Sequence, residues 1–116
     1  MPEKGIAMLE PLLGSRNSER VLIFILAREE GYASEIAAFF DTDLYGIQRQ
    51  LDKLEAGGIM ASRKVGRTRL YRFNPRCPFL GELKSLLSKS LSFCPPAEKE
   101  RLTVFRTRPR RRGKPL

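Results

Sequence analysis

The side chains that most often carry out chemistry are scarce in this sequence. It contains no histidine, which excludes Ser-His-Asp and Cys-His catalysis and any histidine-ligated metal site. Its two cysteines, Cys77 and Cys94, form no CxxC pair. Asp52 and Glu55 stand three residues apart on a predicted helix, a spacing more typical of solvated carboxylates than of a metal site. We therefore expect a protein that is not an enzyme and that uses no metal ion or other cofactor.

The chemistry that the sequence does offer is the binding of anions. The 116 residues include 22 Lys and Arg against 13 Asp and Glu, for a net charge of +9 and a pI near 10.2. Residues 101–116 carry seven of these basic residues and no acidic one, whereas residues 1–100 are almost balanced. A second basic segment, RKVGRTRLYR at 63–72, also contains no acidic residue. Such a distribution points to a polyanion as partner, either a nucleic acid or an anionic membrane surface.

The sequence favours a nucleic acid over a membrane surface as the partner. No apolar run reaches the roughly 18–20 residues that a membrane span requires. The opening MPEKGIAMLE contains acidic residues and lacks the apolar stretch of a signal peptide. Two thiols in a chain with no other sign of secretion are more typical of reduced cysteines than of a disulfide. We expect a cytoplasmic protein that is not bound to a membrane.

The basic segment at 63–72 must be positioned by a fold, and hydrophobic periodicity predicts helices before it. A helix capped by Asn17 or Ser18 is expected to end near Gly31, and a short helix follows over 34–40. A DTD turn then leads into a third helix. In this turn Asp41 suits a left-handed backbone conformation and Asp43 is a good N-cap.

The third helix is expected to begin at Leu44 and to end at Gly57-Gly58. Its apolar residues Leu44, Ile47, Leu51 and Leu54 recur every three or four positions, so we predict that all four lie in the core. Tyr45, Gln48 and Arg49 fall on the opposite, exposed face.

The rest of the sequence predicts a β-hairpin and one more helix. Residues 59–74 mix apolar and basic side chains around Gly66, which indicates two strands with a tip between Gly66 and Thr68. Residues 79–91 form an apolar helical stripe, which Pro95-Pro96 ends. We expect one domain over 1–96 and a basic, disordered tail over 97–116, although PAEKERLTVF is also compatible with a short helix.

This order of elements predicts a mainly α protein with a small β-hairpin, an α+β fold of the winged helix-turn-helix type. A short helix and a longer one joined by a tight turn form a helix-turn-helix unit. A basic hairpin directly after the longer helix forms the wing. In this arrangement the longer helix can enter a major groove, and the hairpin can contact flanking phosphates or a minor groove.

Three segments, 34–40, 47–59 and 66–74, resemble the ArsR-like winged-helix regulators of bacteria and archaea. They carry the pattern L..LE..GI followed by R..GR.R.Y..N, and the resemblance covers about residues 17–92. It implies sequence-selective binding of double-stranded DNA by a homodimer that regulates transcription. Cysteine and histidine clusters of the metal-sensing kind are not present, and no small-molecule effector can be identified from the sequence.

The resemblance also implies which residues face the DNA. On the longer helix it indicates Asp43, Tyr45, Gly46, Gln48 and Arg49, and in the wing it indicates Arg67 and Arg69. To these the basic segment adds Arg63, Lys64 and Thr68 as neighbours that could contact phosphates.

Apolar residues at both ends of the domain predict a two-fold dimer interface, because a small domain has little core for an additional apolar helix to cover. The alternative is that these residues pack on the core of their own monomer. The residues expected at the interface are Leu9, Leu12, Leu13, Phe79, Leu80, Leu83, Leu86, Leu87 and Leu91.

A different function remains open for the same fold. Asp41 and Asp43 place two carboxylates at the start of the longer helix, where they would repel phosphates. They favour a winged-helix module that binds RNA or another protein without reading a DNA sequence.

Overall fold

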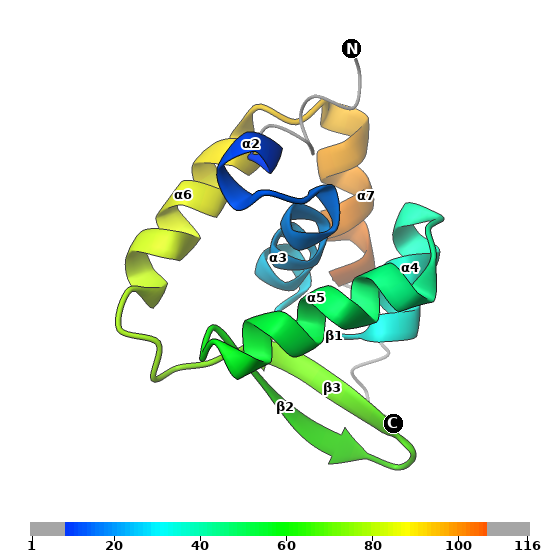
Figure 1. Ribbon diagram of the computed structural model, residues 1–116. Coiled ribbons are helices and arrows are strands. Elements are labelled where there is room, and N and C mark those ends of the chain that lie inside the picture. Colours follow the sequence, from blue (N-terminus) through cyan, green and yellow to red (C-terminus); the bar gives the residue numbers. More distant parts are fainter. Residues whose placement is uncertain (1–8, 107–116) are drawn as a thin grey trace.

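The computed structural model describes residues 9–106, which form an α+β fold (Figure 1). It contains one antiparallel three-stranded sheet, in which the strand order is β1-β3-β2, and the β2–β3 hairpin projects beyond the helices (Figure 1). This architecture is compatible with the winged helix expected from the sequence. The elements, in chain order, are α2 (Glu10–Leu13), α3 (Arg16–Arg28), β1 (Glu30–Tyr32), α4 (Ala33–Phe40), α5 (Leu44–Ala56), β2 (Met60–Val65), β3 (Thr68–Phe73), α6 (Leu80–Ser92) and α7 (Pro96–Arg106).

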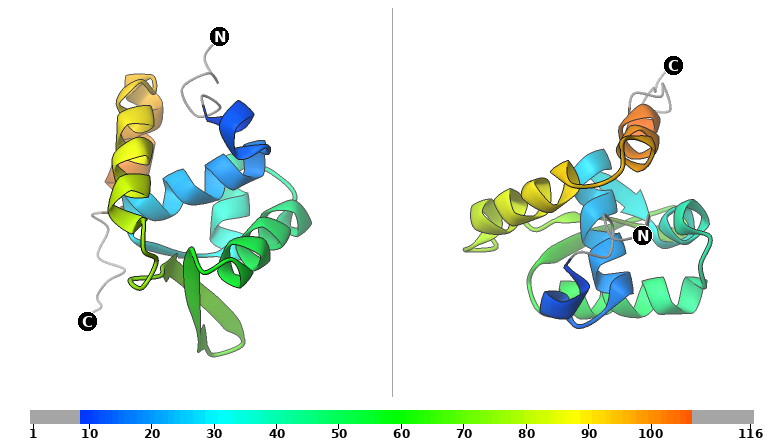
Figure 2. Two further views of the ribbon diagram at one scale, coloured as in Figure 1. Left: turned by 60° about the vertical axis from the view of Figure 1, so that its left-hand side comes forward. Right: turned by 90° about the horizontal axis from the view of Figure 1, so that it is seen from above.

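Helix α3 is the centre of the core. Val21, Ile23, Phe24 and Ile25 are completely buried on it, and the other helices and the sheet lie around it in all three views (Figures 1 and 2). A helix buried on all sides explains the uninterrupted apolar run VLIFIL. The expected N-cap is wrong by two or three residues, because Ser15 caps the helix by accepting a hydrogen bond from the backbone N–H of Ser18.

Strand β1 was not predicted. The expected helix end at Gly31 is wrong, because α3 ends at Arg28 and Glu29 adopts a positive φ of 76°. The chain then pairs with β3 over three residues, with Gly31 opposite Tyr71. A side chain at Gly31 would place its Cβ 2.7 Å from Phe24 Cε1, so only glycine allows the strand to approach α3 this closely.

The turn between α4 and α5 follows the prediction. Asp41 has a left-handed φ of 54°, and Asp43 Oδ2 accepts a hydrogen bond from the backbone N–H of Gly46 at 3.2 Å. Further along α5, Ile47 and Leu51 are completely buried and Leu54 is nearly so. The prediction that Leu44 is also core is wrong.

The hairpin of β2 and β3 turns at Gly66-Arg67, as expected, because Val65 pairs directly with Thr68. Gly66 has a φ of +63°, and Arg67 does not share a positive φ. A glycine with positive φ at the first of two loop positions is what a type II′ hairpin turn needs. The hairpin extends below α5 in Figure 1, away from the core.

The expected start of a disordered tail at residue 97 is wrong, because residues 96–106 form α7, which packs beside α3. Leu102 on α7 is completely buried. Arg101 adds a hydrogen bond from Nη2 to the carbonyl oxygen of Phe39 at 2.9 Å, and its guanidinium lies 4.2 Å from the centre of the Phe39 ring. The remainder of the expected tail, 107–116, lies outside the described residues.

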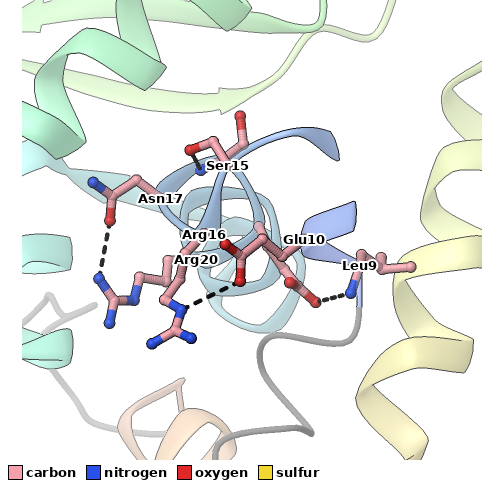
Figure 3. Close-up of polar contacts among 8 residues, drawn as sticks. Leu9, Glu10, Ser15, Arg16, Asn17 and Arg20 are labelled. Atoms are coloured by element: carbon pink, nitrogen blue, oxygen red, sulfur yellow. Dashed lines mark hydrogen bonds and ion pairs between the residues drawn. The ribbon is translucent and has the colours of Figure 1, made fainter. Parts of the chain in front are cut away.

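A buried carboxylate connects α2 to α3 (Figure 3). Glu19 on α3 is completely buried, and its Oε2 accepts a hydrogen bond from the backbone N–H of Leu9 at 2.8 Å. Burial, which disfavours the charged form, raises the pKa of Glu19 above its ordinary value. At the surface nearby, Glu10 and Arg16 form an ion pair at 3.5 Å. Within residues 9–106, no helix has the length and apolar character needed to span a bilayer.

Candidate functional site

The first two turns of α5 present large side chains to solvent. Leu44 is 50% exposed and Tyr45 is 67% exposed. Arg49, one turn after Tyr45, is also exposed, and its guanidinium carbon lies 5.8 Å from the centre of the Tyr45 ring. This is a long cation–π contact between two exposed side chains on the outer surface of α5.

Gln48 points from α5 toward the hairpin and is half-buried. Its amide nitrogen donates to Asp52 Oδ1 and to the Tyr71 hydroxyl, each at 3.0 Å. Tyr71 is almost completely buried, and this burial raises the pKa of its hydroxyl. The hydrogen bond from Gln48 opposes that shift, and the charges of Asp52 and Glu55 add to it. Gln48 therefore joins α5 to β3.

Gly46 lies close to α3. A Cβ at this position would lie 2.6 Å from Asn17 Nδ2 at the start of α3. The amide oxygen of the same side chain, Asn17 Oδ1, accepts a hydrogen bond from Arg20 at 3.0 Å (Figure 3). A side chain at Gly46 would therefore meet the Asn17 amide of α3, and the expectation that Gly46 faces the DNA stays a prediction.

The five basic residues of the hairpin are all exposed, but they lie on both faces of the sheet. Lys64 pairs directly with Arg69. The pairs of Ser62 with Tyr71 and of Met60 with Phe73 lie on the same face of the hairpin, which is the face toward α5. Because strand side chains alternate, the two basic residues share that face. Arg63 and Arg72 fall on the opposite face, and Arg67 occupies the turn. The structure thus brings Lys64, Arg67 and Arg69 toward α5 and separates Arg63 from them.

A chain of hydrogen bonds orients Arg69. Its Nη1 donates to Ser62 Oγ at 3.0 Å, and the Ser62 hydroxyl donates to Glu55 Oε2 at 2.7 Å. The chain runs from β3 across β2 to α5, so it fixes the angle between the hairpin and the helix. Arg69 remains exposed at its end.

These elements enclose a groove of about 290 Å³, which we call the α5–hairpin groove. Exposed Leu44 forms part of its wall, and Arg67 and Arg69 supply positive charge. Thr68, expected to face the DNA, also lines it. The complete lining is Tyr32, Ala33, Ser34, Leu44, Gln48, Arg67, Thr68, Arg69 and Tyr71.

A larger open hollow of about 840 Å³ lies between α3, the sheet and the start of α6. It contains Arg72 from the opposite face of the hairpin, together with Glu30, which pairs with Arg72 across the strands. Charges of opposite sign directly opposite each other stabilise a strand pair. Arg72 thus lies away from the α5–hairpin groove.

The residues expected at a dimer interface divide into three groups. Leu9 and Leu87 are buried in the core of the monomer, so the expectation that they contact a partner is wrong. Four others are half-buried against that core, namely Leu13, Leu80, Leu83 and Leu91. The remaining three are exposed, namely Leu12 at 67%, Phe79 at 49% and Leu86 at 38%.

Sequence reasoning missed two exposed apolar residues. Leu44 fits the apolar period of α5, but it is the first residue of the helix and is 50% exposed. The signal for its exposure was Asp43 just before it, because a capping residue places the next side chain at the helix end. Phe93, 59% exposed, follows the last residue of α6, and nothing in the sequence distinguished it from core.

Comparisons of this chain with protein-family models, with curated proteins and with solved structures find no match. Its function must therefore be inferred from its residues and their geometry. Within the part of the chain that the structure describes, cysteine, aspartate and glutamate side chains form no group of three that could hold a metal ion.

Proposed function

We propose that this protein is a winged helix-turn-helix regulator that binds double-stranded DNA. In this proposal α4 and α5 form the helix-turn-helix unit, and β2 and β3 form the wing. The observation that carries it is the α5–hairpin groove. There the exposed start of α5 lies beside the basic side chains of Arg67 and Arg69, and Lys64 projects from the same face of the hairpin as Arg69. A helix that enters a major groove needs this combination, because one element reads base edges while the other contacts the phosphate backbone.

The electrostatics of the hairpin support an anionic partner. Lys64 and Arg69 stand directly opposite each other, and like charges in such a pair destabilise a sheet. No acidic side chain pairs with Lys64 among residues 9–106. A phosphate between Lys64 and Arg69 would replace the repulsion with two favourable contacts.

Within this function Arg49 is the principal candidate for a base contact. It is exposed, and its guanidinium has the two donors that suit the O6 and N7 atoms of guanine. Lys64, Arg67 and Arg69 would contact phosphates and set the position of α5 along the duplex. Arg63 lies on the other face of the hairpin, so we assign it at most a contact with a more distant phosphate.

We also propose that the protein acts as a homodimer through α6. The exposed residues Phe79, Leu86 and Phe93 give this helix and its ends an apolar surface that the monomer does not cover. A symmetric pair would present two α5 helices to half-sites about one turn of DNA apart.

Selection of bound duplexes from a random DNA pool at physiological salt tests the proposed function. We expect an enriched motif with two related half-sites. The variant Arg49→Ala should then bind the enriched duplex and a scrambled duplex with similar affinity, whereas Arg76→Ala serves as the matched control. Arg76 is exposed in the connection between β3 and α6, and its loss should leave discrimination unchanged. A pool that yields no enriched duplex would refute the proposal.

A second candidate function rests on the acidic residues at the start of α5. Asp41 and Asp43 are both exposed, and two carboxylates beside a phosphate backbone are unfavourable. They favour a module that binds RNA or a basic protein surface. Tight binding of a structured RNA, with weaker binding of every duplex DNA, would support this second function over the first.

A further inference from the structure

We propose that Leu44 recognises the C5-methyl group of thymine and that Gln48 is a positioning residue rather than a base-reading one. The inference rests on the proposed function, because it assigns sequence readout at the same site. It gives the start of α5 a preference for A·T base pairs at the positions that Leu44 reaches.

The exposure of Leu44 is the first observation. It is the first residue of α5, 50% exposed, and it lines the α5–hairpin groove between Arg67 and Arg69 on one side and α4 on the other. Half of the surface of Leu44 stays in water in the monomer, so a ligand that covers this surface would gain free energy from its burial. The basic surroundings of Leu44 make a purely apolar protein partner a poor occupant of the groove, because burying those charges without an anion would be costly.

The engagement of Gln48 is the second observation. Glutamine reads adenine by donating one amide hydrogen to N7 while its oxygen accepts from N6. In the structure both amide hydrogens are directed elsewhere, one to Asp52 Oδ1 and one to the Tyr71 hydroxyl. Reading adenine would require Gln48 to give up a hydrogen bond to a buried hydroxyl. The side chain instead holds α5 against β3, and the reading of A·T pairs passes to its neighbours.

The chemistry of the major groove supplies the match. Among the base edges exposed there, the thymine methyl is the distinctive apolar group, and it marks T·A and A·T pairs against G·C. A leucine placed at the entering end of a helix can bury that methyl while Lys64, Arg67 and Arg69 contact the adjacent phosphates. Leu44 therefore combines an apolar contact with a charged rim that suits DNA.

Uracil substitution provides the test, because it removes only the methyl group. The enriched duplex from the random pool is synthesised with thymine, and again with deoxyuridine at each thymine in turn. Burial of one methyl corresponds to about a threefold to fivefold gain in affinity. We expect the wild-type protein to lose about this factor at one or two positions in each half-site.

The variant Leu44→Ala should bind the thymine and uracil duplexes equally, with an affinity close to that of the wild type for the uracil duplex. Leu12→Ala is the matched control, because Leu12 is also an exposed leucine, at 67% on α2, and lies outside the α5–hairpin groove; it should leave the thymine preference intact. The third variant is Gln48→Ala. If Gln48 is a positioning residue, this variant should bind every duplex more weakly by a similar factor and should select the same motif.

Each opposite result is informative. A wild-type protein that binds every uracil duplex as tightly as the thymine duplex would overturn the inference while leaving DNA binding established. Loss of adenine preference in Gln48→Ala would restore Gln48 as a base reader. If no duplex is enriched, or a structured RNA that lacks the methyl binds more tightly, both the proposed function and this inference fail.

Discussion

Truncation of Leu87 distinguishes a core position from an interface position on α6. Leu87 is completely buried within one chain, whereas Leu86 beside it is 38% exposed. Replacing a fully buried leucine by alanine costs about 2–5 kcal/mol, because the transfer free energy of the side chain is lost and a cavity remains. Leu87→Ala should therefore destabilise the monomer itself.

The surroundings of Leu87 narrow the expected loss of stability. Leu80, Leu83 and Leu91 are only half-buried, so Leu87 is the main attachment of α6 to α3. The half-buried side chains beside it can shift partly into the space that Leu87 leaves, which places the loss toward the lower end of the range. We therefore expect about 2–3 kcal/mol, which corresponds to a fall of about 1–2 M in the urea midpoint. Leu86→Ala should cost less than about 1 kcal/mol.

The assay is urea unfolding followed by far-ultraviolet circular dichroism at two protein concentrations about tenfold apart, because the stability of a dimer depends on concentration. The loss in Leu87→Ala should be the same at both concentrations. If it grows as the protein concentration rises, Leu87 is buried between two copies and our reasoning is wrong. A loss below about 1 kcal/mol would also refute it.

Three further predictions concern other parts of the molecule. The Ser90 hydroxyl is buried and has no hydrogen-bond partner among the described residues. Ser90→Ala should therefore stabilise the protein by about 1 kcal/mol and raise its Tm by roughly 4 °C. An unchanged Tm would mean that the hydroxyl does have a hydrogen-bond partner. Burial raises the pKa of Glu19 above its ordinary value of 4.5. The protonated Glu19 side chain therefore contributes its full share to the free energy of unfolding below pH 4.5, and this share declines as the pH rises through the folded-state pKa. Glu19→Gln should flatten this decline in urea midpoints measured across the pH range, and an identical pH profile would contradict the assignment. Lys64→Thr should raise stability by about 0.2–1 kcal/mol by removing the repulsion from Arg69, while it lowers the salt slope of DNA binding by about one. Lys89→Ala on α6 should change neither quantity, and a Lys64 variant that keeps the full salt slope would show that Lys64 contacts no phosphate.

Features that depend on near neighbours in the chain were predictable. The cap at Asp43, the left-handed Asp41 and the hairpin turn at Gly66 all follow from the conformational preferences of single residues. The core positions of α5 followed from periodicity, apart from the first turn. The basic character of the hairpin could also be read directly, because it concerns composition over ten residues.

Features that depend on distant segments were not predictable. Strand β1 is three residues long, too short for an alternating pattern, and it exists only because β3 offers it a free edge. Helix α7 carries a weakly amphipathic sequence, and its position depends on the surface that α3 provides for Leu102. The burial of Leu87 and the exposure of Leu86 depend on how α6 is rotated on α3.

The candidate site shows the same division. The sequence alone determined which residues are basic, which helix precedes them and where the chain turns, since these are properties of local preference and order. The tertiary structure decided that Gly46 faces Asn17, that Gln48 is held by Tyr71 and that Arg63 lies on the other face from Lys64 and Arg69. It also left Leu44 exposed beside two arginines. Each of these outcomes depends on packing between elements, which pairs residues far apart in sequence and therefore leaves no local pattern from which it could be read.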